Sequence, residues 1–314
     1  TINKANGTLS ISDTIDARGN WTHTQGTVDS GISKVSFKAE TQTVDAAGMD
    51  FYNVDVAASG GSPTLTVTGV MDVNNNFTII SARNINSGTI TVSGSLISSD
   101  TNVDGTANIR LDGNENQVWE STTSDPWPNG TFTIAKPSGT ATLSGALSAN
   151  DSGQDLSLTG GTLDLNGYNL TVNDVFEIGT GTTLKLHGNE TIPTIDTMWD
   201  HATVHYNDED ATLTMLDAGF WNVIIGSTGS AVYHLPRQDS WVMSGSLTIS
   251  GGTLAVSNGQ TLTVSGAWIE TYGSFSPGSG SVVLSGRNGV VALSGSSFNN
   301  LTISGASLLT QYHH

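Results

Sequence analysis

Apolar and polar residues alternate in short runs along the whole chain, and Gly, Asn or Ser ends each run after about three to five residues. Residues 161–172 and 252–266 are two examples in which Leu, Val or Ala recur two positions apart. A period of two is typical of β-strands, whose successive side chains point to opposite faces, and no helical spacing is found. The pattern therefore predicts an all-β chain made of very short strands.

The spacing of these runs favours a solenoid. Runs begin about every 7 or 8 residues, which is too close for the strands of an ordinary sandwich, and three such runs make a coil of about 22 residues. One inward Leu, Val or Ile from each strand would stack on its equivalents about 4.8 Å above and below. We therefore predict one single-stranded parallel β-solenoid over residues 1–312, with about 14 coils.

A longer repeat links the two ends of the sequence. Residues 21–56 align without a gap with residues 268–303, so that Trp21 corresponds to Trp268. Both blocks close with the motif Phe-x-Asn-apolar-x-apolar, which begins at Phe51 in one and Phe298 in the other. The paired apolar positions between these landmarks are Val35 with Phe37, and Val282 with Leu284.

Two degenerate copies lie between these blocks, which divides the chain into four units at approximately 1–60, 61–135, 136–228 and 229–305. In the second unit, Leu96 takes the Trp place and Val118 the place of Val44; in the third, Phe176 takes the Trp place and residues 187–203 form an inserted loop. The closing His313 and His314 are interpreted as the remnant of a purification tag. Asn53, Asn222 and Asn300 are expected to form side-chain ladders or to occupy corners between coils.

Charge and composition exclude several classes of partner. The chain has 10 Lys and Arg against 28 Asp and Glu, a formal net charge of −18, so a polyphosphate or an anionic membrane would repel it. It has no cysteine, which excludes disulfides and thiolate metal sites. The negative charge makes nucleic acid binding unexpected, and since no run of about 18 apolar residues occurs, membrane insertion is not expected either.

One segment matches the start of a calcium-binding loop. Asp100, Asn102 and Asp104 alternate and are followed by Gly105, as in the opening Asp-x-Asn-x-Asp-Gly of such loops. The acid expected at the twelfth position is Leu111 instead. The two interpretations are a Ca²⁺ site and a turn rich in Asx residues.

The densest group of polar and aromatic residues lies between Trp199 and Asp210. His201 and His205 are four residues apart, so on one strand they would share a face and, with Asp208 or Asp210, could bind a transition metal. If the chain is an enzyme, the catalytic residues would be Asp200, His201 and Asp208; the candidate ligand-binding residues are Trp199, His201, His205 and Tyr206. The alternative is a loop that decorates the solenoid. The order Trp199-Asp200-His201 also resembles the Trp-Ile-Asp-His segment of pectate lyases, without the isoleucine.

By its repeat pattern the chain resembles the repetitive passenger regions of bacterial and archaeal surface proteins and adhesins, which are right-handed parallel β-helices. The resemblance implies display outside the cell. We expect a non-enzymatic extracellular structural or adhesive protein: a surface stalk, a filament subunit or an envelope-layer component. Its partners would be further repeats or copies of itself, with glycans as a second class. The alternative is a carbohydrate-active β-helix, such as a polysaccharide lyase, a hydrolase or a phage tailspike, or a carbohydrate-binding module.

Overall fold

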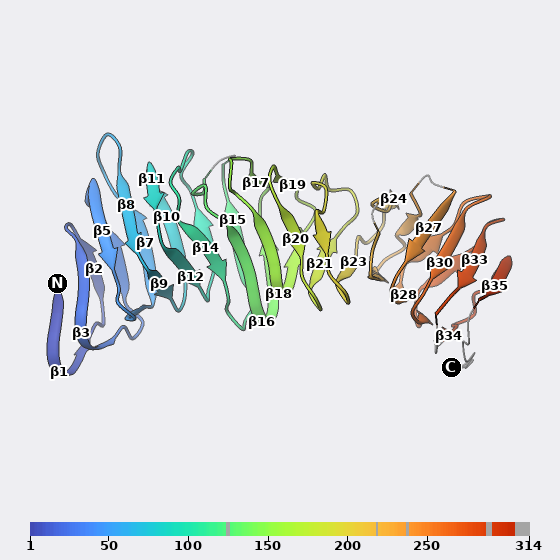
Figure 1. Cartoon of the computed structure of the whole chain (residues 1–314), viewed down its shortest axis with the longest axis horizontal. Helices are drawn as coiled ribbons and strands as arrows, with labels where there is room; N and C mark the ends of the chain where they lie inside the picture. The colour runs from blue at the N-terminus through green and yellow to red at the C-terminus, as the bar shows by residue number, and fades with distance from the viewer. Residues whose placement is uncertain (124–125, 218, 237–238, 287–290, 305–314) are drawn as a thin grey trace. The chain divides into compact units, whose positions relative to one another are not determined.

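The computed structural model describes residues 1–123, 126–217, 219–236, 239–286 and 291–304, and these contain strands and turns but no helix (Figure 1). They therefore include no helix able to cross a membrane. Parallel strands stack as a β-solenoid of about 14 turns, which confirms the predicted fold class. Residues 313–314, the predicted tag remnant, lie outside the described residues.

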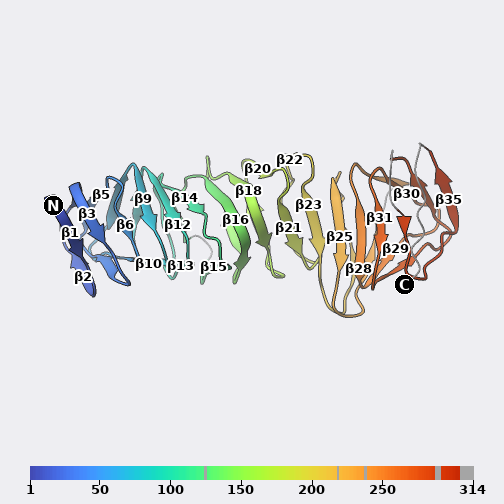
Figure 2. The ribbon, with the colours of Figure 1, turned by 90° about the horizontal axis from the view of Figure 1, so that it is seen from below.

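The chain divides into two compact units. Unit 1 comprises residues 1–164, 168–177 and 191–196, and unit 2 comprises residues 165–167, 178–190 and 197–314. In each unit three parallel ladders run beside one another, as three strands per coil predict (Figures 1 and 2).

In unit 1 the first ladder contains β1 (Ile2–Ser10), β3 (Trp21–Asp29), β5 (Thr41–Asp45), β8 (Thr64–Thr68) and β11 (Asn84–Asn86). The second contains β2 (Thr14–Ala17), β4 (Lys34–Phe37), β7 (Asn53–Ala57), β10 (Phe77–Ser81), β13 (Leu96–Ser98) and β15 (Gln117–Ser121). The third contains β6 (Asp50–Phe51), β9 (Val70–Val73), β12 (Thr89–Val92) and β14 (Asn108–Leu111). The long strands β16 (Phe132–Leu143) and β18 (Leu156–Asp164) continue both the second and the third ladder. A separate pair is formed by β17 (Leu147–Ala149) and β19 (Leu170–Val172), after which β20 (Phe176–Ile178) follows in the sequence.

In unit 2 one ladder contains β21 (Thr183–Leu186), β23 (Thr203–Tyr206), β25 (Asn222–Gly226), β28 (Leu247–Gly251), β31 (Trp268–Glu270) and β34 (Val291–Ala292). Another contains β24 (Thr212–Thr214), β26 (Val232–His234), β29 (Thr253–Ala255) and β32 (Ser274–Ser276). The last contains β27 (Ser240–Met243), β30 (Thr261–Val264), β33 (Ser281–Leu284) and β35 (Asn300–Ile303). The short strand β22 (Thr197–Met198) precedes β23.

The length of a turn agrees with the sequence estimate. Val35 pairs with Val54 in a short turn and Phe132 pairs with Leu156 in a longer one, and these separations bracket the coil length expected from the sequence. The segment expected as an inserted loop, residues 187–203, does not lengthen its turn. Thr183 of β21 pairs with Thr203 of β23, which is the same separation as that between Thr14 and Lys34 of β2 and β4.

The strand register reproduces the long sequence repeat. Trp21 pairs with Val44 as Trp268 pairs with Val291, and the two Trp side chains pack against Phe51 and Phe298, with ring centroids 5.6 and 5.1 Å apart. Residues 21–56 and 268–303 align without a gap, so every equivalent pair is as far apart in the sequence as Trp21 and Trp268. The correspondence extends further toward the N-terminus than the alignment indicated. The pair Ile2 with His23 matches Ile249 with Glu270, and the pair Thr14 with Lys34 matches Thr261 with Ser281.

The core consists of columns of inward side chains. On the second ladder of unit 1, Phe77 pairs with Leu96 and Leu96 with Trp119, and all three are buried. Each such side chain contributes about 1.5–3 kcal/mol by its burial. In the second sequence repeat, residues 61–135, the strand face differs from the predicted one at one position. Val118, expected to point inward, is 40% exposed, because Trp119 faces Leu96 and the alternation of the strand turns its neighbour outward.

Amide side chains join successive turns. The Asn53 Oδ1 atom accepts a hydrogen bond from Asn75 Nδ2 at 2.9 Å, and Asn222 Oδ1 accepts from the Ser246 amide at 2.9 Å. The Asn53–Asn75 contact is a side-chain ladder, as predicted, whereas Asn222 joins its turn to backbone groups of the neighbouring turns and Asn300 lies exposed on β35. Inside the coil, buried glutamines also link one turn to the next. Gln117 donates from Nε2 to the carbonyl oxygens of Val92, at 2.8 Å, and of Gly94.

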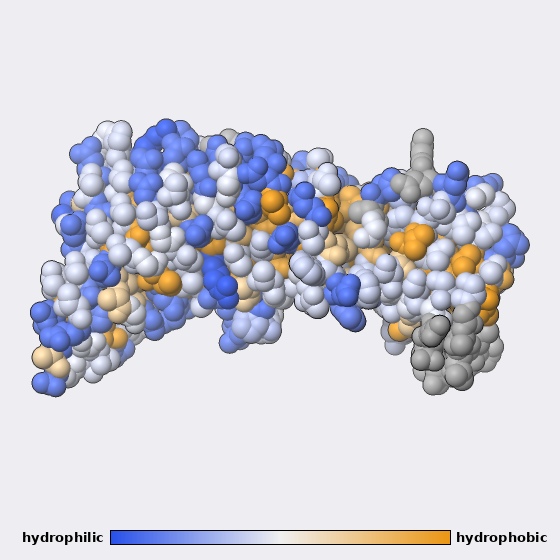
Figure 3. Space-filling model, viewed as in Figure 1, coloured by the Kyte–Doolittle hydropathy of each residue, from blue (hydrophilic) through white to orange (hydrophobic). Residues whose placement is uncertain are grey.

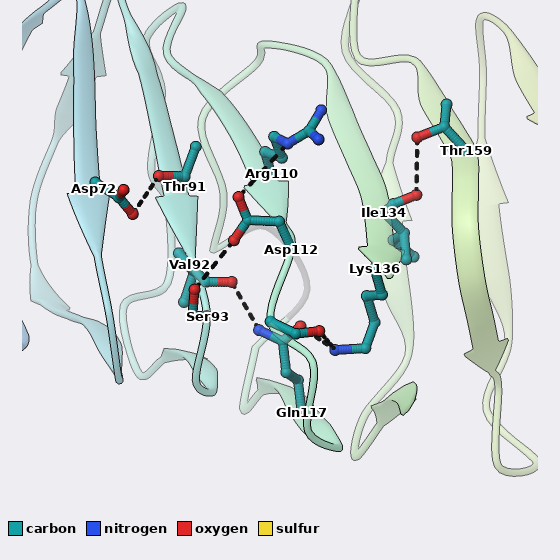
Figure 4. Close-up of polar contacts among 11 residues, drawn as sticks. Asp72, Thr91, Val92, Ser93, Arg110, Asp112, Gln117, Ile134, Lys136 and Thr159 are labelled. Carbon is teal, nitrogen blue, oxygen red and sulfur yellow. Dashed lines mark hydrogen bonds and ion pairs between the residues drawn. The ribbon is translucent and has the colours of Figure 1, made fainter. Parts of the chain in front are cut away.

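A buried lysine completes this corner of unit 1 (Figure 4). Lys136 Nζ donates to the carbonyl oxygens of Gly113 at 2.7 Å and Glu115 at 2.8 Å, and to Oε1 of Gln117. Burial lowers the pKa of Lys136, and the charges of Asp112 and Glu115 oppose this shift. The ammonium group thus replaces its hydration by hydrogen bonds to three acceptors.

Candidate functional site

The polar and aromatic cluster between Trp199 and Asp210 lies in unit 2, and the structure separates its two histidines. His205 lies on the outward face of β23, in register with Lys185 and Ile224. His201 lies in the turn before β23 with a left-handed φ of 65°, and its ring centroid is 5.3 Å from that of Trp221. The expectation that one strand carries both histidines is therefore wrong, because β23 begins only at Thr203.

Tyr206, predicted to bind a ligand, is a core residue. Its side chain is fully buried, its ring centroid is 5.3 Å from that of Tyr233, and its hydroxyl accepts a hydrogen bond from the Leu216 amide at 3.1 Å. The alternation of β23 places Val204 and Tyr206 inside and His205 outside. The hydroxyl therefore anchors the following turn.

Asp208, a candidate catalytic acid, is part of the same anchored turn. Its amide donates to the Tyr233 hydroxyl at 2.6 Å, and its Oδ1 accepts from the Asp210 amide at 3.1 Å. The other carboxylate oxygen is 4.0 Å from His187 Nδ1, a long and partly exposed ion pair if His187 is protonated. Asp200 is exposed in the turn that carries His201. The described part of the chain has no group of three or more His, Asp or Glu side chains that could hold a metal ion.

The two buried tyrosines make unit 2 sensitive to alkali. Burial raises the pKa of Tyr206 far above its ordinary value, and burial together with the charges of Asp208 and Glu190 raises the pKa of Tyr233 to about 12. Hydrogen bonds from backbone amides oppose both shifts. An unfolded tyrosine ionises at about pH 10. The stability that these phenols contribute is therefore complete below about pH 10 and falls as the pH rises toward 12 and beyond.

We predict that the free energy of unfolding of unit 2 falls steeply between about pH 10 and 12, measured by urea titration at each pH. Tyr206→Phe and Tyr233→Phe should each make this decline shallower, because each removes one group that ionises more readily in the unfolded chain. Tyr272→Phe is the matched control, since Tyr272 is 92% exposed. An identical decline in all three variants would contradict the assignment.

The calcium-loop residues make contacts within the protein. Asp100 Oδ2 accepts from the Ala82 amide at 2.6 Å, and its Oδ1 accepts from the Thr101 amide at 2.6 Å. Asp104 Oδ2 is 2.6 Å from Nη2 of Arg83, while Asn102 is exposed. These contacts are those of an Asx-rich turn next to an ion pair, and the Ca²⁺ site stays a prediction.

The exposed aromatic residues are few among those that the structure describes. Trp119, Trp127 and Trp241 are buried in the core, whereas Trp199 is 55% exposed and Tyr272 is 92% exposed. On the face that Figure 3 presents, apolar residues are scattered among hydrophilic ones. Scattered exposed apolar side chains are normal for a protein surface.

The sequence analysis missed a polar cleft in unit 2. It has a volume of about 610 Å³ and is lined by Thr214, His234, Leu235, Asp239, Ser257, Asn258 and Gln260. Thr214 and His234 come together because β24 and β26 pair in register, although the two residues belong to different turns. The hydroxyl, amide and imidazole groups can form hydrogen bonds with a polar molecule. No short motif connects these residues, so only the repeat register could have indicated this cleft.

No family model, no curated protein and no solved structure matches the chain. The functional argument therefore depends on the geometry and chemistry of the chain itself.

Proposed function

We propose that this chain is a non-enzymatic structural repeat protein of the cell surface, serving as an adhesin stalk, a filament subunit or an envelope-layer component. The observation that carries the proposal is the recurrence of one strand register in the first and the last repeat unit of the chain. An active site is needed once in a chain. A stacking pattern that is kept from turn to turn serves a structure built by repetition along an axis.

The distribution of charge supports the same proposal. A net charge of −18 keeps an exposed protein soluble and disfavours contact with nucleic acids and anionic lipids. The carbohydrate-active alternative needs two carboxylates placed around a glycosidic bond. Asp208, one of the two acids predicted for that alternative, accepts a hydrogen bond from the Asp210 amide within a turn, which supports the structural function.

Brief protease treatment of intact cells of the source organism tests this proposal. We expect the treatment to remove the protein, detected by an antibody against the chain, while a cytoplasmic marker is retained. Protein that is cut only after cell lysis would overturn the surface location. Release of reducing sugar from a polysaccharide, lost in Asp200→Asn or Asp208→Asn, would overturn the non-enzymatic assignment.

A further inference from the structure

We propose that Trp199, His201 and Trp221, which we call the aromatic corner of unit 2, bind a neutral polysaccharide by packing against the apolar faces of its hexopyranose rings. The proposal rests on the proposed surface function and names a partner for it, a glycan outside the cell. A sugar ring has an apolar face of C–H groups with hydroxyl groups around its edge. An exposed indole beside hydrogen-bonding groups is complementary to such a ring.

Two successive turns bring the three side chains to one corner. Trp199 and His201 belong to the turn before β23, in which the Ala202 amide donates to the Trp199 carbonyl oxygen at 3.1 Å. Trp221 lies at the same corner one turn later, before β25, since the Asn222 amide donates to the Ala202 carbonyl oxygen at 3.0 Å; β23 and β25 lie side by side in Figure 2. The His201 and Trp221 rings contact each other, with centroids 5.3 Å apart and planes inclined at 44°.

The core does not need these side chains for its packing. Phe220, the residue before Trp221, points inward, is buried, and has its ring centroid 5.6 Å from that of Trp241. Trp199 is 55% exposed, His201 is exposed and Trp221 is half-buried. Folding therefore leaves much of the apolar surface of this corner in water, where a ligand can still cover it.

The turns on either side carry no side chain large enough to cover the aromatic corner. On one side, residues 179–182 are Gly-Thr-Gly-Thr, and the Thr203 amide donates to the Thr182 carbonyl oxygen at 2.9 Å. On the other side, the Gly245 amide donates to the Trp221 carbonyl oxygen at 2.7 Å. A Cβ atom at Gly245 would lie 2.5 Å from that oxygen and 2.7 Å from Trp221 Cδ1, so the close backbone stacking keeps the space beside the indole free of a side chain.

Polar groups lie beside the aromatic side chains. Asp200 is exposed between Trp199 and His201, and Thr180 and Ser244 are exposed in the turns on either side. Carboxylate, hydroxyl and imidazole groups form hydrogen bonds with hydroxyl groups. A few such groups next to an apolar surface can orient a sugar whose ring packs on the indoles.

The charge of the chain selects the class of polysaccharide. Residues 179–182, 199–202, 220–222 and 244–246 contain no Lys or Arg, so no permanent positive charge is present at this corner to pair with a uronate or a sulfate group. The net charge of −18 and the nearby Asp200 repel an acidic polysaccharide. A neutral chain of hexopyranoses avoids this repulsion, and its binding should depend little on salt.

Titration calorimetry of the full chain with neutral oligosaccharides tests the site. The probes are short β-1,4-linked chains of glucose, of mannose and of N-acetylglucosamine, and we expect at least one of them to bind. Trp199→Ala and Trp221→Ala should each weaken this binding about tenfold, because each removes one stacking surface. Trp199→Phe should retain most of the affinity, since it keeps an aromatic ring at the exposed position.

Tyr272→Ala is the matched control. Tyr272 is 92% exposed in the same unit but follows β31, away from the corner before β23 and β25, so its replacement should leave the affinity unchanged. Circular dichroism of each variant shows whether it is folded, and the exposed position of Trp199 makes Trp199→Ala the variant that keeps the fold most securely.

Failure of all neutral probes to bind overturns the glycan site. Binding that both Trp199→Ala and Trp221→Ala retain also overturns it, because the sugar would then lie elsewhere on the chain. Binding of choline in place of the sugars, lost in Trp199→Ala, overturns the ligand class in favour of an organic cation. If no sugar binds but protease removes the protein from intact cells, only the glycan site has failed and the proposed function stands.

Discussion

Trp119→Ala is expected to lower the free energy of unfolding of unit 1 by about 3–5 kcal/mol. The side chain is 1% exposed and lies in the column between Leu96 and Leu143. Its ring centroid is 5.9 Å from that of Trp127 and 5.1 Å from that of Phe132. Alanine removes these contacts and leaves a cavity that the turns above and below can fill only by shifting their backbones.

Urea unfolding followed by circular dichroism measures this effect, and Trp199→Ala is the matched control. Trp199 is 55% exposed, so its replacement should change the free energy of unfolding by at most about 0.5 kcal/mol. In a repeat protein each turn is stabilised mainly by its neighbours, so the loss should destabilise the turns around β15 first. A small effect of Trp119→Ala would mean that Trp119 does not hold the column together.

The class of fold could be predicted because the rule that produces it is local. Alternation of apolar and polar residues fixes which side chains point inward, and Gly or Asn at the end of each run fixes where the chain bends. Trp21 and Trp268 could be matched at sequence level because each is followed by the same series of inward positions. The structure pairs them with Val44 and Val291, at the same distance along the chain.

Which residues point inward could not be predicted in the same way where a copy of the repeat is degenerate. Val118 and Trp119 are both apolar neighbours, and a shift of one residue exchanges the inward and outward positions of a strand. The structure selects Trp119 because the wider side chain fills the column opposite Leu96. Packing between turns, which the single strand does not reveal, decides between the two.

The prediction that His201 and His205 share one strand face was wrong for a related reason. His201 and His205 have the spacing of residues on one face of a strand, but the backbone at His201 adopts a left-handed conformation before the strand starts. Glycine adopts this conformation most readily, and His, like Asn and Asp, adopts it in only a small fraction of its occurrences, so the histidine alone does not predict it from the sequence. Lys136 was missed because lysine is normally exposed, and its burial is tolerable because two carbonyl oxygens of the previous turn and the Gln117 side chain accept its hydrogen bonds.

Gly113→Ala is expected to destabilise unit 1 by about 1–3 kcal/mol, although the substitution adds a single methyl group. A Cβ atom at this position would lie 1.9 Å from the carbonyl oxygen of Ser93 in the preceding turn, and 2.7 Å from its carbonyl carbon. The obstacle is backbone, so no side-chain rotation relieves it. The two turns would have to separate, and separation weakens the Ser93 Oγ hydrogen bond to Asp112 Oδ1, now 3.3 Å, together with neighbouring ladder contacts (Figure 4).

Gly19→Ala in the same unit is the matched control and should change stability in the opposite direction, raising the free energy of unfolding by at most about 1 kcal/mol. An added Cβ there meets no atom within 4 Å, and the residue does not have a left-handed φ. Both variants replace glycine by alanine, so any effect on the unfolded chain is common to them. Their difference therefore measures how closely successive turns approach, and equal effects would mean that the tight stacking at Gly113 does not limit which residues this solenoid can accept.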